Sequence, residues 1–299
     1  MNFLSSDDLT KDSINKIFSI ADRFAAGKEV ESVKEHATVA LLFEEPSTRT
    51  RISFEVAVAQ LGGTAIYVDA HTSQLVRGES LADTAKVISS YCDFIAVRIN
   101  DHDRLVEIAE NSTVPVINAL TLLEHPTQAL ADVYTIRQHR RDISKAKIAF
   151  VGDISQNTAN SLMLTASKLG AEVNLVGPKG YQPNNRCYTK ANSHSKIHLI
   201  HSIEDGLEDA DVIYTDTFVS MGRESSAEKR RKLFAPYQVT SKMLKFAKPN
   251  AIVMHPLPAH RGEEIAADVI DGKQSVVWEQ ARNKLLLEKA LLVYLSNGR

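Results

Sequence analysis

The chain has 299 residues, of which 43% are hydrophobic and 24% are charged, and both values are ordinary for a soluble globular protein. Because that length exceeds what one simple core needs, we expect two domains. The formal net charge of -2 gives no overall attraction to nucleic acid or to an anionic membrane, so an anion-binding site would have to be local.

The cysteine content and the two ends of the chain favour a cytoplasmic protein. Cys92 and Cys187 are too few for a disulfide framework or a cysteine zinc site, which favours a reducing compartment. The start, MNFLSSDDLTKDS, carries acidic residues early and does not look like a signal peptide. The apolar tail LLLEKALLVYL is interrupted by Glu288 and Lys289 and is shorter than the ~20 residues of a membrane span. We expect small-molecule partners, with no nucleic acid and no membrane.

Strand and helix patterns alternate in the first half of the chain. The first predicted strand is ATVALLF (37–43), a continuous apolar run typical of a strand buried on both faces of a parallel sheet. A helix pattern follows in TRISFEVAVAQLG and ends at Gly62 and Gly63. The next predicted elements are the strand TAIYVD (64–69), the helix SLADTAKVISSYC, the strand DFIAVRI, the helix DRLVEIAENS and the strand VPVINAL.

The same alternation restarts after a helix of about residues 125–140, which is expected to join the domains. Its elements are the strand KIAFVGD (147–153), the helix NSLMLTASKLG, and the strands AEVNLVGP, ADVIYTD and AIVMHPL (251–257). We therefore predict an α/β fold with two consecutive parallel-sheet domains, helices on both faces and interdomain helices. The expected bounds are 1–135 and 136–278, with a last helix of about 279–299 packing back on the first domain. Ligands of such sheets bind at the carboxyl ends of strands.

The stretch FEEPSTRTR (43–51) places hydroxyl and guanidinium groups directly after the first predicted strand. Pro46 suits a helix start, and Ser47 or Thr48 is a good N-cap residue. The first turn of a helix has unpaired backbone N–H groups and carries the positive end of the dipole. Glutamate is normally favoured there, but Arg49 takes the place, which predicts an anion site best suited to phosphate. The alternative is a capped helix with solvated arginines.

Six blocks, in order over nearly the whole chain, resemble the aspartate/ornithine carbamoyltransferase family. The first is the Ser-Thr-Arg-Thr-Arg turn, which binds the phosphate of carbamoyl phosphate in that family. The others are SQLVRGESLADTAKVIS (73–89), AVR (96–98), EHPTQALADVYTI (124–136), TDTFVSMG (215–222) and HPLPAHRGEEI (255–265). The resemblance implies that residues 1–135 form a carbamoyl phosphate-binding domain and residues 136–278 an amino-acid-binding domain.

The resemblance also implies a residue set for carbamoyl phosphate. The phosphate clamp would consist of Ser47, Thr48, Arg49 and Thr50. Arg98, His125 and Gln128 would point at the carbamoyl group, where donors on the carbonyl oxygen polarise it. His125 and Gln128 are three residues apart and therefore share one helix face. Taken alone, His125 would more often be a helix-cap or core residue, and Arg98 an ordinary surface residue.

Gln74 belongs to a loop that family members extend into the active site of a neighbouring subunit. The resemblance therefore implies active sites shared between subunits in a homotrimer or a multiple of trimers. Taken alone, Gln74 would be a solvated loop residue.

The block TDTFVSMG is similar to the Asp-x-x-x-Ser-Met-Gly block of ornithine-specific family members. By this resemblance, ornithine is held by Asn157, Asp216, Ser220 and Met221. Asp216 suits the α-ammonium group, although it could instead cap a loop. An extra residue in GDISQNTANS leaves Gln156 as an alternative to Asn157. The expected catalytic residues are Arg49, Arg98, His125 and Asp216.

Two positions depart from the pattern of ornithine-specific members. Residues 255–258 read HPLP, as in aspartate-specific members, where His-Cys-Leu-Pro is usual; Pro256 and Leu257 are still expected at the carbamoyl phosphate site. The late arginine of the family is Lys284 here, and it is expected to bind carbamoyl phosphate. The AHRG that follows HPLP is again of the ornithine type.

The resulting prediction is an ornithine carbamoyltransferase of arginine metabolism that makes citrulline and phosphate from ornithine and carbamoyl phosphate. A neutral amine would attack directly, and the departing phosphate would take the proton. The alternatives are transfer to aspartate or putrescine, or a non-enzymatic phosphate- or amino-acid-binding module. A nicotinamide-dependent dehydrogenase is disfavoured because IAFVGDISQN lacks Gly-x-Gly-x-x-Gly. We expect no cofactor, and no metal because the ten histidines show no paired ligand spacing.

Overall fold

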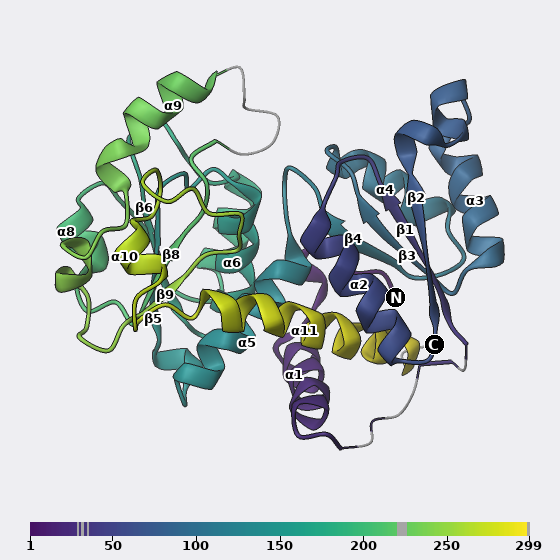
Figure 1. The fold of residues 1–299 in the computed structure, drawn as a ribbon, viewed down its shortest axis with the longest axis horizontal. Helices are drawn as coiled ribbons and strands as arrows, with labels where there is room; N and C mark the ends of the chain where they lie inside the picture. Colours follow the sequence, from purple (N-terminus) through teal and green to yellow (C-terminus); the bar gives the residue numbers. More distant parts are fainter. Residues whose placement is uncertain (29, 31–32, 35, 220–225, 298–299) are drawn as a thin grey trace. The chain divides into compact units, whose positions relative to one another are not determined.

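The computed structural model describes residues 1–28, 30, 33–34, 36–219 and 226–297. The chain divides into two compact units, Met1–Leu130 with Lys284–Arg299, and Ala131–Asn283. Both divisions fall inside helices, since α5 spans Pro126–His139 and α11 spans Val277–Asn297 (Figure 1). Each of these two helices therefore contributes residues to both units.

The first unit is built on a four-stranded parallel sheet. Its strands are β1 (Thr38–Phe43), β2 (Thr64–Asp69), β3 (Phe94–Arg98) and β4 (Val116–Leu120), in the spatial order β2-β1-β3-β4. Every residue of β3 and β4 is buried, as are the last five of β1. The continuous apolar runs of the sequence therefore correspond to strands covered on both faces.

Helices flank the strands of this sheet in the chain order that the sequence predicts. They are α2 (Thr48–Gln60), α3 (Leu81–Tyr91) and α4 (His102–Asn111), preceded by α1 (Lys11–Ala25) and accompanied by the short 3₁₀ helices η1 (Ser6–Asp8), η2 (Ala70–Thr72) and η3 (Gln74–Arg77). The last helix contacts the first two. Tyr294 of α11 donates to Ser13 of α1 at 2.8 Å, and Lys289 donates to Gln60 of α2 at 3.1 Å.

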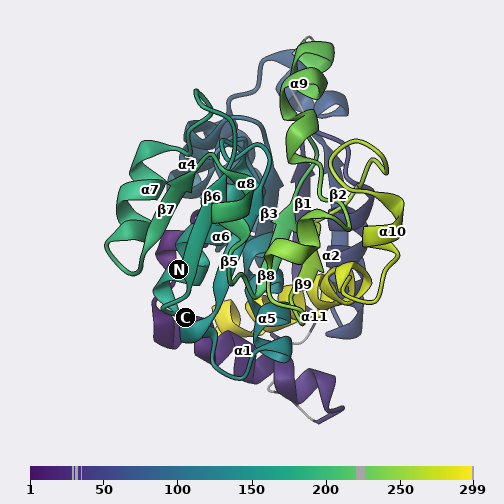
Figure 2. The same cartoon turned by 90° about the vertical axis from the view of Figure 1, so that its left-hand side faces the viewer.

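The second unit is built on a five-stranded parallel sheet, seen in Figure 2. Its strands are β5 (Lys147–Val151), β6 (Glu172–Val176), β7 (Ile197–Ile200), β8 (Val212–Thr215) and β9 (Ile252–Met254), in the order β7-β6-β5-β8-β9. The edge strand β7 is absent from the sequence prediction. Its residues are mostly half-buried or exposed, so it lacks the apolar run that reveals the central strands.

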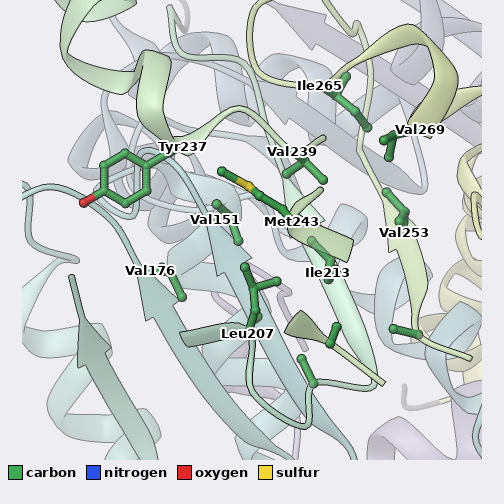
Figure 3. Close-up of a cluster of buried hydrophobic side chains, with 14 of the residues drawn as sticks. Val151, Val176, Leu207, Ile213, Tyr237, Val239, Met243, Val253, Ile265 and Val269 are labelled. Atoms are coloured by element: carbon green, nitrogen blue, oxygen red, sulfur yellow. The ribbon is translucent and has the colours of Figure 1, made fainter. Parts of the chain in front are cut away.

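The remaining elements of the second unit surround that sheet. They are α6 (Asn157–Lys168), α7 (Asn185–Asn192), α8 (Ile203–Leu207), α9 (Ala227–Phe234), α10 (Ala267–Ile270) and the 3₁₀ helices η4 (Ile143–Lys145), η6 (Ala235–Tyr237) and η7 (Met243–Phe246). Strand side chains such as Val151, Ile213 and Val253 pack with Val239 and Met243 in one buried cluster (Figure 3). This core fixes the ends of the strands from which the polar loops emerge.

Each sheet has a point where the chain reverses its direction of winding. In the first unit that point lies between β1 and β3, where Phe43 pairs with Arg98. In the second it lies between β5 and β8, where Val151 pairs with Thr215. Because parallel sheets bind ligands in the crevice at such points, the loops after these four strands are the candidate binding loops. Within the described part of the chain, no helix combines the length and apolar character needed to cross a membrane.

Candidate functional site

The turn after β1 forms the start of α2. Ser47 is the N-cap residue, with extended backbone, and its hydroxyl accepts a hydrogen bond from the Thr50 N–H at 3.3 Å. No acidic residue occupies the first turn, so no side chain of that turn neutralises the positive end of the helix dipole. Thr48 and Arg49 are exposed there, whereas Thr50 is buried. The turn therefore presents donors outward, as an anion site requires.

The two glutamates before this turn join it to the loop after β3. Glu44 pairs with Arg104 and accepts the Asn100 N–H at 3.1 Å. Glu45 accepts a hydrogen bond from the Asn100 side-chain amide at 3.0 Å. These bonds hold the loops after β1 and β3 together at the switch point of the sheet, beside Arg98.

Arg51 is engaged by two neighbouring side chains. Its Nε donates to Glu55 at 2.8 Å, and its guanidinium lies 3.8 Å from the centroid of the Tyr67 ring. Of the two arginines in the turn motif, Arg49 is the one whose charge acts on Arg98 and His125.

Arg98 and His125 are both buried, and their surroundings change their proton affinity. Burial is the main cause that lowers the pKa of Arg98 to about 10; Arg49 acts in the same direction and Glu45 in the opposite one. Burial also holds the pKa of His125 well below its ordinary 6.5, reinforced by the positive charges of Lys284, Arg98 and Arg49. His125 is therefore a neutral imidazole at neutral pH, with three cations acting on it.

Lys284 reaches this group from α11. Its ammonium donates to the Thr50 hydroxyl at 2.9 Å, and both side chains are buried. Such a concentration of positive charge is unfavourable by itself and is relieved when an anion binds. The first unit thus contains a strongly cationic, partly buried group of residues at the carboxyl ends of its strands.

Gln128 and Gln74 differ in their placement within the first unit. Gln128 is buried in the first turn of α5, where the His125 carbonyl accepts its N–H at 3.1 Å. Gln74 begins η3 and is exposed. The structure therefore groups Gln128 with His125, whereas Gln74 lies on the surface of the unit.

In the second unit, Asp216 follows β8 and is buried. It accepts hydrogen bonds from the Thr158 hydroxyl and the Thr217 N–H, each at 2.7 Å. Burial raises the pKa of its carboxyl group, whereas nearby His255 and the two hydrogen bonds act in the opposite direction. Thr158 belongs to α6, which follows β5, so this contact joins the loops on the two sides of the second switch point.

The loop after β5 contains both residues that the sequence left as alternatives. Gln156 is the buried N-cap residue of α6, and its amide donates to the Thr217 carbonyl. Asn157, the first residue of α6, is partly exposed. Gln156 thus supports the Asp216 loop, and Asn157 is the more accessible of the two. The predicted residues Ser220 and Met221 lie outside the described residues.

The loop after β9 carries Pro256 and Leu257, both half-buried. The Leu257 N–H donates to His255 Nδ1 at 2.9 Å, so this nitrogen is unprotonated and Nε2 carries the hydrogen. Nε2 in turn lies 3.0 Å from Glu264. Glu264 also accepts the His260 N–H. The segment 255–265 is therefore held by one buried histidine–glutamate pair.

Two family models match this chain almost from end to end. The one described as "Aspartate/ornithine carbamoyltransferase, carbamoyl-P binding domain" matches residues 1–138, and the one described as "Asp/Orn binding domain" matches residues 144–295. The chain belongs to the aspartate/ornithine carbamoyltransferase family.

Named relatives and solved structures of this family agree in sequence and fold. The anabolic ornithine carbamoyltransferase of Pyrococcus furiosus is 45% identical over 99% of this chain and 96% of its own. That of Methanobrevibacter smithii is 45% identical over 98% of each chain. The solved structure of the Pyrococcus furiosus enzyme is similar with a TM-score of 0.94 and 45% identity, and the match covers 100% of this chain and 97% of that one. The solved structure of the anabolic enzyme of Campylobacter jejuni is similar with a TM-score of 0.93 and 38% identity, and the match covers 100% of this chain and 99% of that one. The predicted family and fold class are confirmed.

Several residues that support these aspartate/ornithine carbamoyltransferase loops escaped the sequence analysis. Gln280 of α11 accepts the His255 N–H at 2.9 Å and donates to Asp132 at 2.7 Å. Tyr214 of β8 donates to the same carboxylate at 2.9 Å. No local pattern could have revealed this network, because 148 residues separate Asp132 from Gln280.

A second supporting residue is Arg230 in α9. Its guanidinium pairs with buried Asp153 after β5 and donates from Nε to the Phe218 carbonyl after β8 at 2.7 Å. The one side chain thus braces both loops at the second switch point. In the sequence, Arg230 stands in the charged run EKRRK and resembles a solvated surface residue.

Among the described residues, one group of potential metal ligands lies together in space, although their sequence spacing does not predict a metal site. One ring nitrogen of His260 and one carboxylate oxygen each of Glu263 and Glu264 lie within 4.8 Å of one another. Glu263 pairs with Arg231 at 3.0 Å, and Glu264 is engaged by His255. These protein contacts explain the cluster as support for the segment 255–265.

Proposed function

We propose that this protein is an ornithine carbamoyltransferase, which transfers the carbamoyl group of carbamoyl phosphate to the side-chain amine of L-ornithine. The observation that carries the proposal is the group of Arg49, Arg98, His125 and Lys284 in the first unit, which the 2.9 Å hydrogen bond from Lys284 to Thr50 joins to the start of α2. This arrangement suits a phosphorylated donor with a carbonyl group. The relatives named above, 45% identical over nearly the full chain, support ornithine as the acceptor.

We assign the donor's phosphate to the start of α2. The N–H groups of the first turn, with the hydroxyls of Ser47, Thr48 and Thr50, supply neutral donors. Arg49 and Lys284 supply charge, and the 2.9 Å bond to Thr50 aims the lysine at this turn. Preorganised donors of this kind stabilise the negative charge that grows on the leaving phosphate.

The carbamoyl group is assigned to Arg98, His125 and Gln128. Arg98 remains protonated at neutral pH, because its pKa of about 10 is still well above 7. His125 contributes as a neutral hydrogen-bonding group, since its pKa lies well below 6.5. Together they polarise the carbonyl bond and stabilise the oxyanion of the tetrahedral intermediate. Pro256 and Leu257, after β9, are assigned to the same substrate.

Ornithine is assigned to the loops of the second unit. Asp216 would accept its α-ammonium group, with Asn157, Ser220 and Met221 as further contacts. A lysine-like amine has a reference pKa of ~10.4 and is mostly protonated at neutral pH, so it must lose a proton before it can attack. The amine nitrogen then forms a bond to the carbonyl carbon, and the bond from that carbon to the phosphate oxygen breaks. The departing phosphate takes one of the two protons on that nitrogen, and the other stays on the nitrogen of citrulline.

Pro256 replaces the cysteine that ornithine-specific members usually carry. It has no ionisable group, so no thiolate can take a proton from the amine at this position. Because aspartate-specific members share the HPLP sequence, Pro256 bears on which amine the enzyme accepts, and a substitution can test this. Restoring the thiol with Pro256→Cys should change the rate with ornithine more than it changes the affinity for carbamoyl phosphate.

The direct test is the formation of citrulline from carbamoyl phosphate and ornithine, followed by mass spectrometry. Aspartate and putrescine serve as competing acceptors in parallel reactions. Citrulline alone supports the proposal. Carbamoyl aspartate or carbamoyl putrescine as the main product would reassign the acceptor, whereas phosphate binding without any carbamoylated amine would indicate a binding module.

We propose in addition that the enzyme is a homotrimer, or a multiple of trimers, in which Gln74 completes the site of a neighbouring subunit. The exposed position of Gln74 at the start of η3 supports this. The first unit also exposes several large apolar side chains that a subunit contact would cover: Ile52, Ile66, Val76, Val87 and Tyr91.

The direction and location of the reaction are further proposals. Two relatives with the word anabolic in their names support the citrulline-forming, biosynthetic direction. Cys92 and Cys187 are buried free thiols, which supports a reducing compartment such as the cytoplasm. Cell fractionation and citrulline synthesis at low substrate concentrations would test the two statements separately.

A further inference from the structure

Glu288 is a buried carboxylate in α11 to which the proposed chemistry gives no role. Its side chain is only 1% exposed. It follows Lys284 by four residues, so the two side chains lie on the same face of the helix. Apart from Lys284, the buried residues within one turn of it in α11 are apolar, such as Leu287 and Leu291. An apolar residue would be the more stable choice at this position, since burial of a carboxylate is costly.

The charged neighbour of Glu288 is Lys284, whose ammonium also donates to Thr50 at 2.9 Å. Among the described residues, neither carboxylate oxygen of Glu288 has a hydrogen-bond partner, since the nearby Ser53 hydroxyl of α2 donates to the Thr50 carbonyl at 3.2 Å. Lys289, the next residue of the helix, directs its ammonium to Gln60 at 3.1 Å. The ammonium of Lys284 therefore contacts the start of α2, and its charge also acts on the carboxyl group of Glu288.

Burial raises the pKa of Glu288 to about 8, and the charge of Lys284 acts against this rise. The same lysine charge is the second cause of the low pKa of His125, after burial. The net charge that Lys284 and Glu288 together add to the group of Arg49 and Arg98 therefore depends on whether Glu288 is ionised.

Building on the proposed function, we propose that Glu288 is a positioning residue that controls the positive charge available at the phosphate turn, the residues 47–50 to which the donor's phosphate is assigned. When Glu288 is protonated, the Lys284 ammonium is left to the anion bound beside Thr50. When Glu288 is ionised, it neutralises that ammonium and draws it back along α11. Anion binding and ionisation of Glu288 therefore oppose each other, and binding of a phosphate dianion is coupled to uptake of a solvent proton by the carboxylate.

The kinetic test is the pH dependence of KM for carbamoyl phosphate at saturating ornithine. If only the protonated form binds, KM should rise about tenfold between pH 7 and pH 9 in the wild type, because pH 9 lies one unit above a pKa of about 8. In Glu288→Gln, which cannot ionise, KM should rise less than twofold. Glu279→Gln is the matched control, since Glu279 lies on the same helix and pairs with His139 outside the proposed machinery.

Calorimetry supplies a readout that does not depend on turnover. Inorganic phosphate is titrated into the wild type at pH 8 in buffers with different ionisation enthalpies. The wild type should take up about half a proton per site, and Glu288→Gln should take up none beyond the contribution of phosphate itself. In a Lys284→Met background, Glu288→Gln should cause no further change, because the charge that the carboxylate controls is gone.

The outcomes separate this inference from the proposed function. A wild-type KM that stays constant from pH 7 to pH 9, or an equal rise in Glu288→Gln, would overturn the role of Glu288. A rise caused by Lys284 itself losing its proton would persist in the variant and would count against the proposal. If no citrulline forms but proton uptake on phosphate binding still depends on Glu288, the proposed reaction is wrong and the role of Glu288 stands. Glu288→Leu serves as a second variant if Glu288→Gln folds poorly.

Discussion

Lys284 donates a hydrogen bond of 2.9 Å to the hydroxyl of Thr50, although 234 residues separate them in the sequence. The bond joins the last helix of the chain to the phosphate turn at the start of α2. It places a flexible ammonium at the turn to which we assign the donor's phosphate. The consequences of this placement, and of the residues around it, can be measured.

Replacing Lys284 with methionine removes the charge and keeps most of the volume of the side chain. A charge-assisted hydrogen bond contributes about 1.5–3 kcal/mol, so KM for carbamoyl phosphate should rise by about 10- to 150-fold. Steady-state kinetics at saturating ornithine will measure this. Lys289→Met is the control, because Lys289 bonds to Gln60 at the surface. An unchanged KM in Lys284→Met would remove the lysine from the donor site.

Arg49 and Arg51 offer a matched pair within one turn. Arg49→Ala should lower kcat/KM for carbamoyl phosphate by about 10²- to 10³-fold, as expected for loss of a preorganised cationic donor. Arg51→Ala should change it little, because Arg51 is engaged by Glu55 and Tyr67. Equal losses in both variants would mean that the turn acts through its fold and not through Arg49.

His125 should remain neutral to pH values well below 6.5, which heteronuclear NMR of the imidazole nitrogens can establish. Because its folded pKa is depressed, its contribution to stability is complete above about pH 6.5 and is lost as the pH falls. His125→Gln should therefore lose less stability than the wild type between pH 7 and pH 5. An imidazole that titrates near 6.5 in the folded protein would contradict both statements.

Asp216 should act on ornithine and not on the donor. Asp216→Asn should raise KM for ornithine by about 10-fold or more, since a charged hydrogen bond is lost, and leave inhibition by phosphate unchanged. Asp209→Asn is a control at an exposed position. Equal weakening of both substrates would indicate that Asp216 is only a structural support for its loop.

Gln74 allows a test of shared sites by subunit mixing. Arg49→Ala and Gln74→Ala subunits should each have little activity alone. In randomly mixed cyclic trimers, about one quarter of the sites would receive an intact Arg49 and an intact Gln74 from the neighbouring subunit. Recovery near that fraction supports sharing. A monomer in light scattering, or a mixture without recovery, would rule it out.

The strands and helices that carry the site were predictable because their signals are local. The apolar run before Glu44 gave β1, and the Pro46–Ser47 pair gave the start of α2. The weak points were segments without such signals, such as the half-exposed edge strand β7. Arg230 was missed for a similar reason, because burial changes the role of a charged residue without changing the local sequence.

By itself, the sequence determined the order of alternating strands and helices and the polar turns that follow the strands, since hydrophobic periodicity and capping act over a few residues. Only the tertiary structure decided which of those groups interact. The neutrality of His125, the bond from Lys284 to Thr50 and the burial of Glu288 depend on helices and strands far apart in the chain. Their physical cause is the loss of water around charges that folding brings close together, and no short stretch of residues encodes that distance.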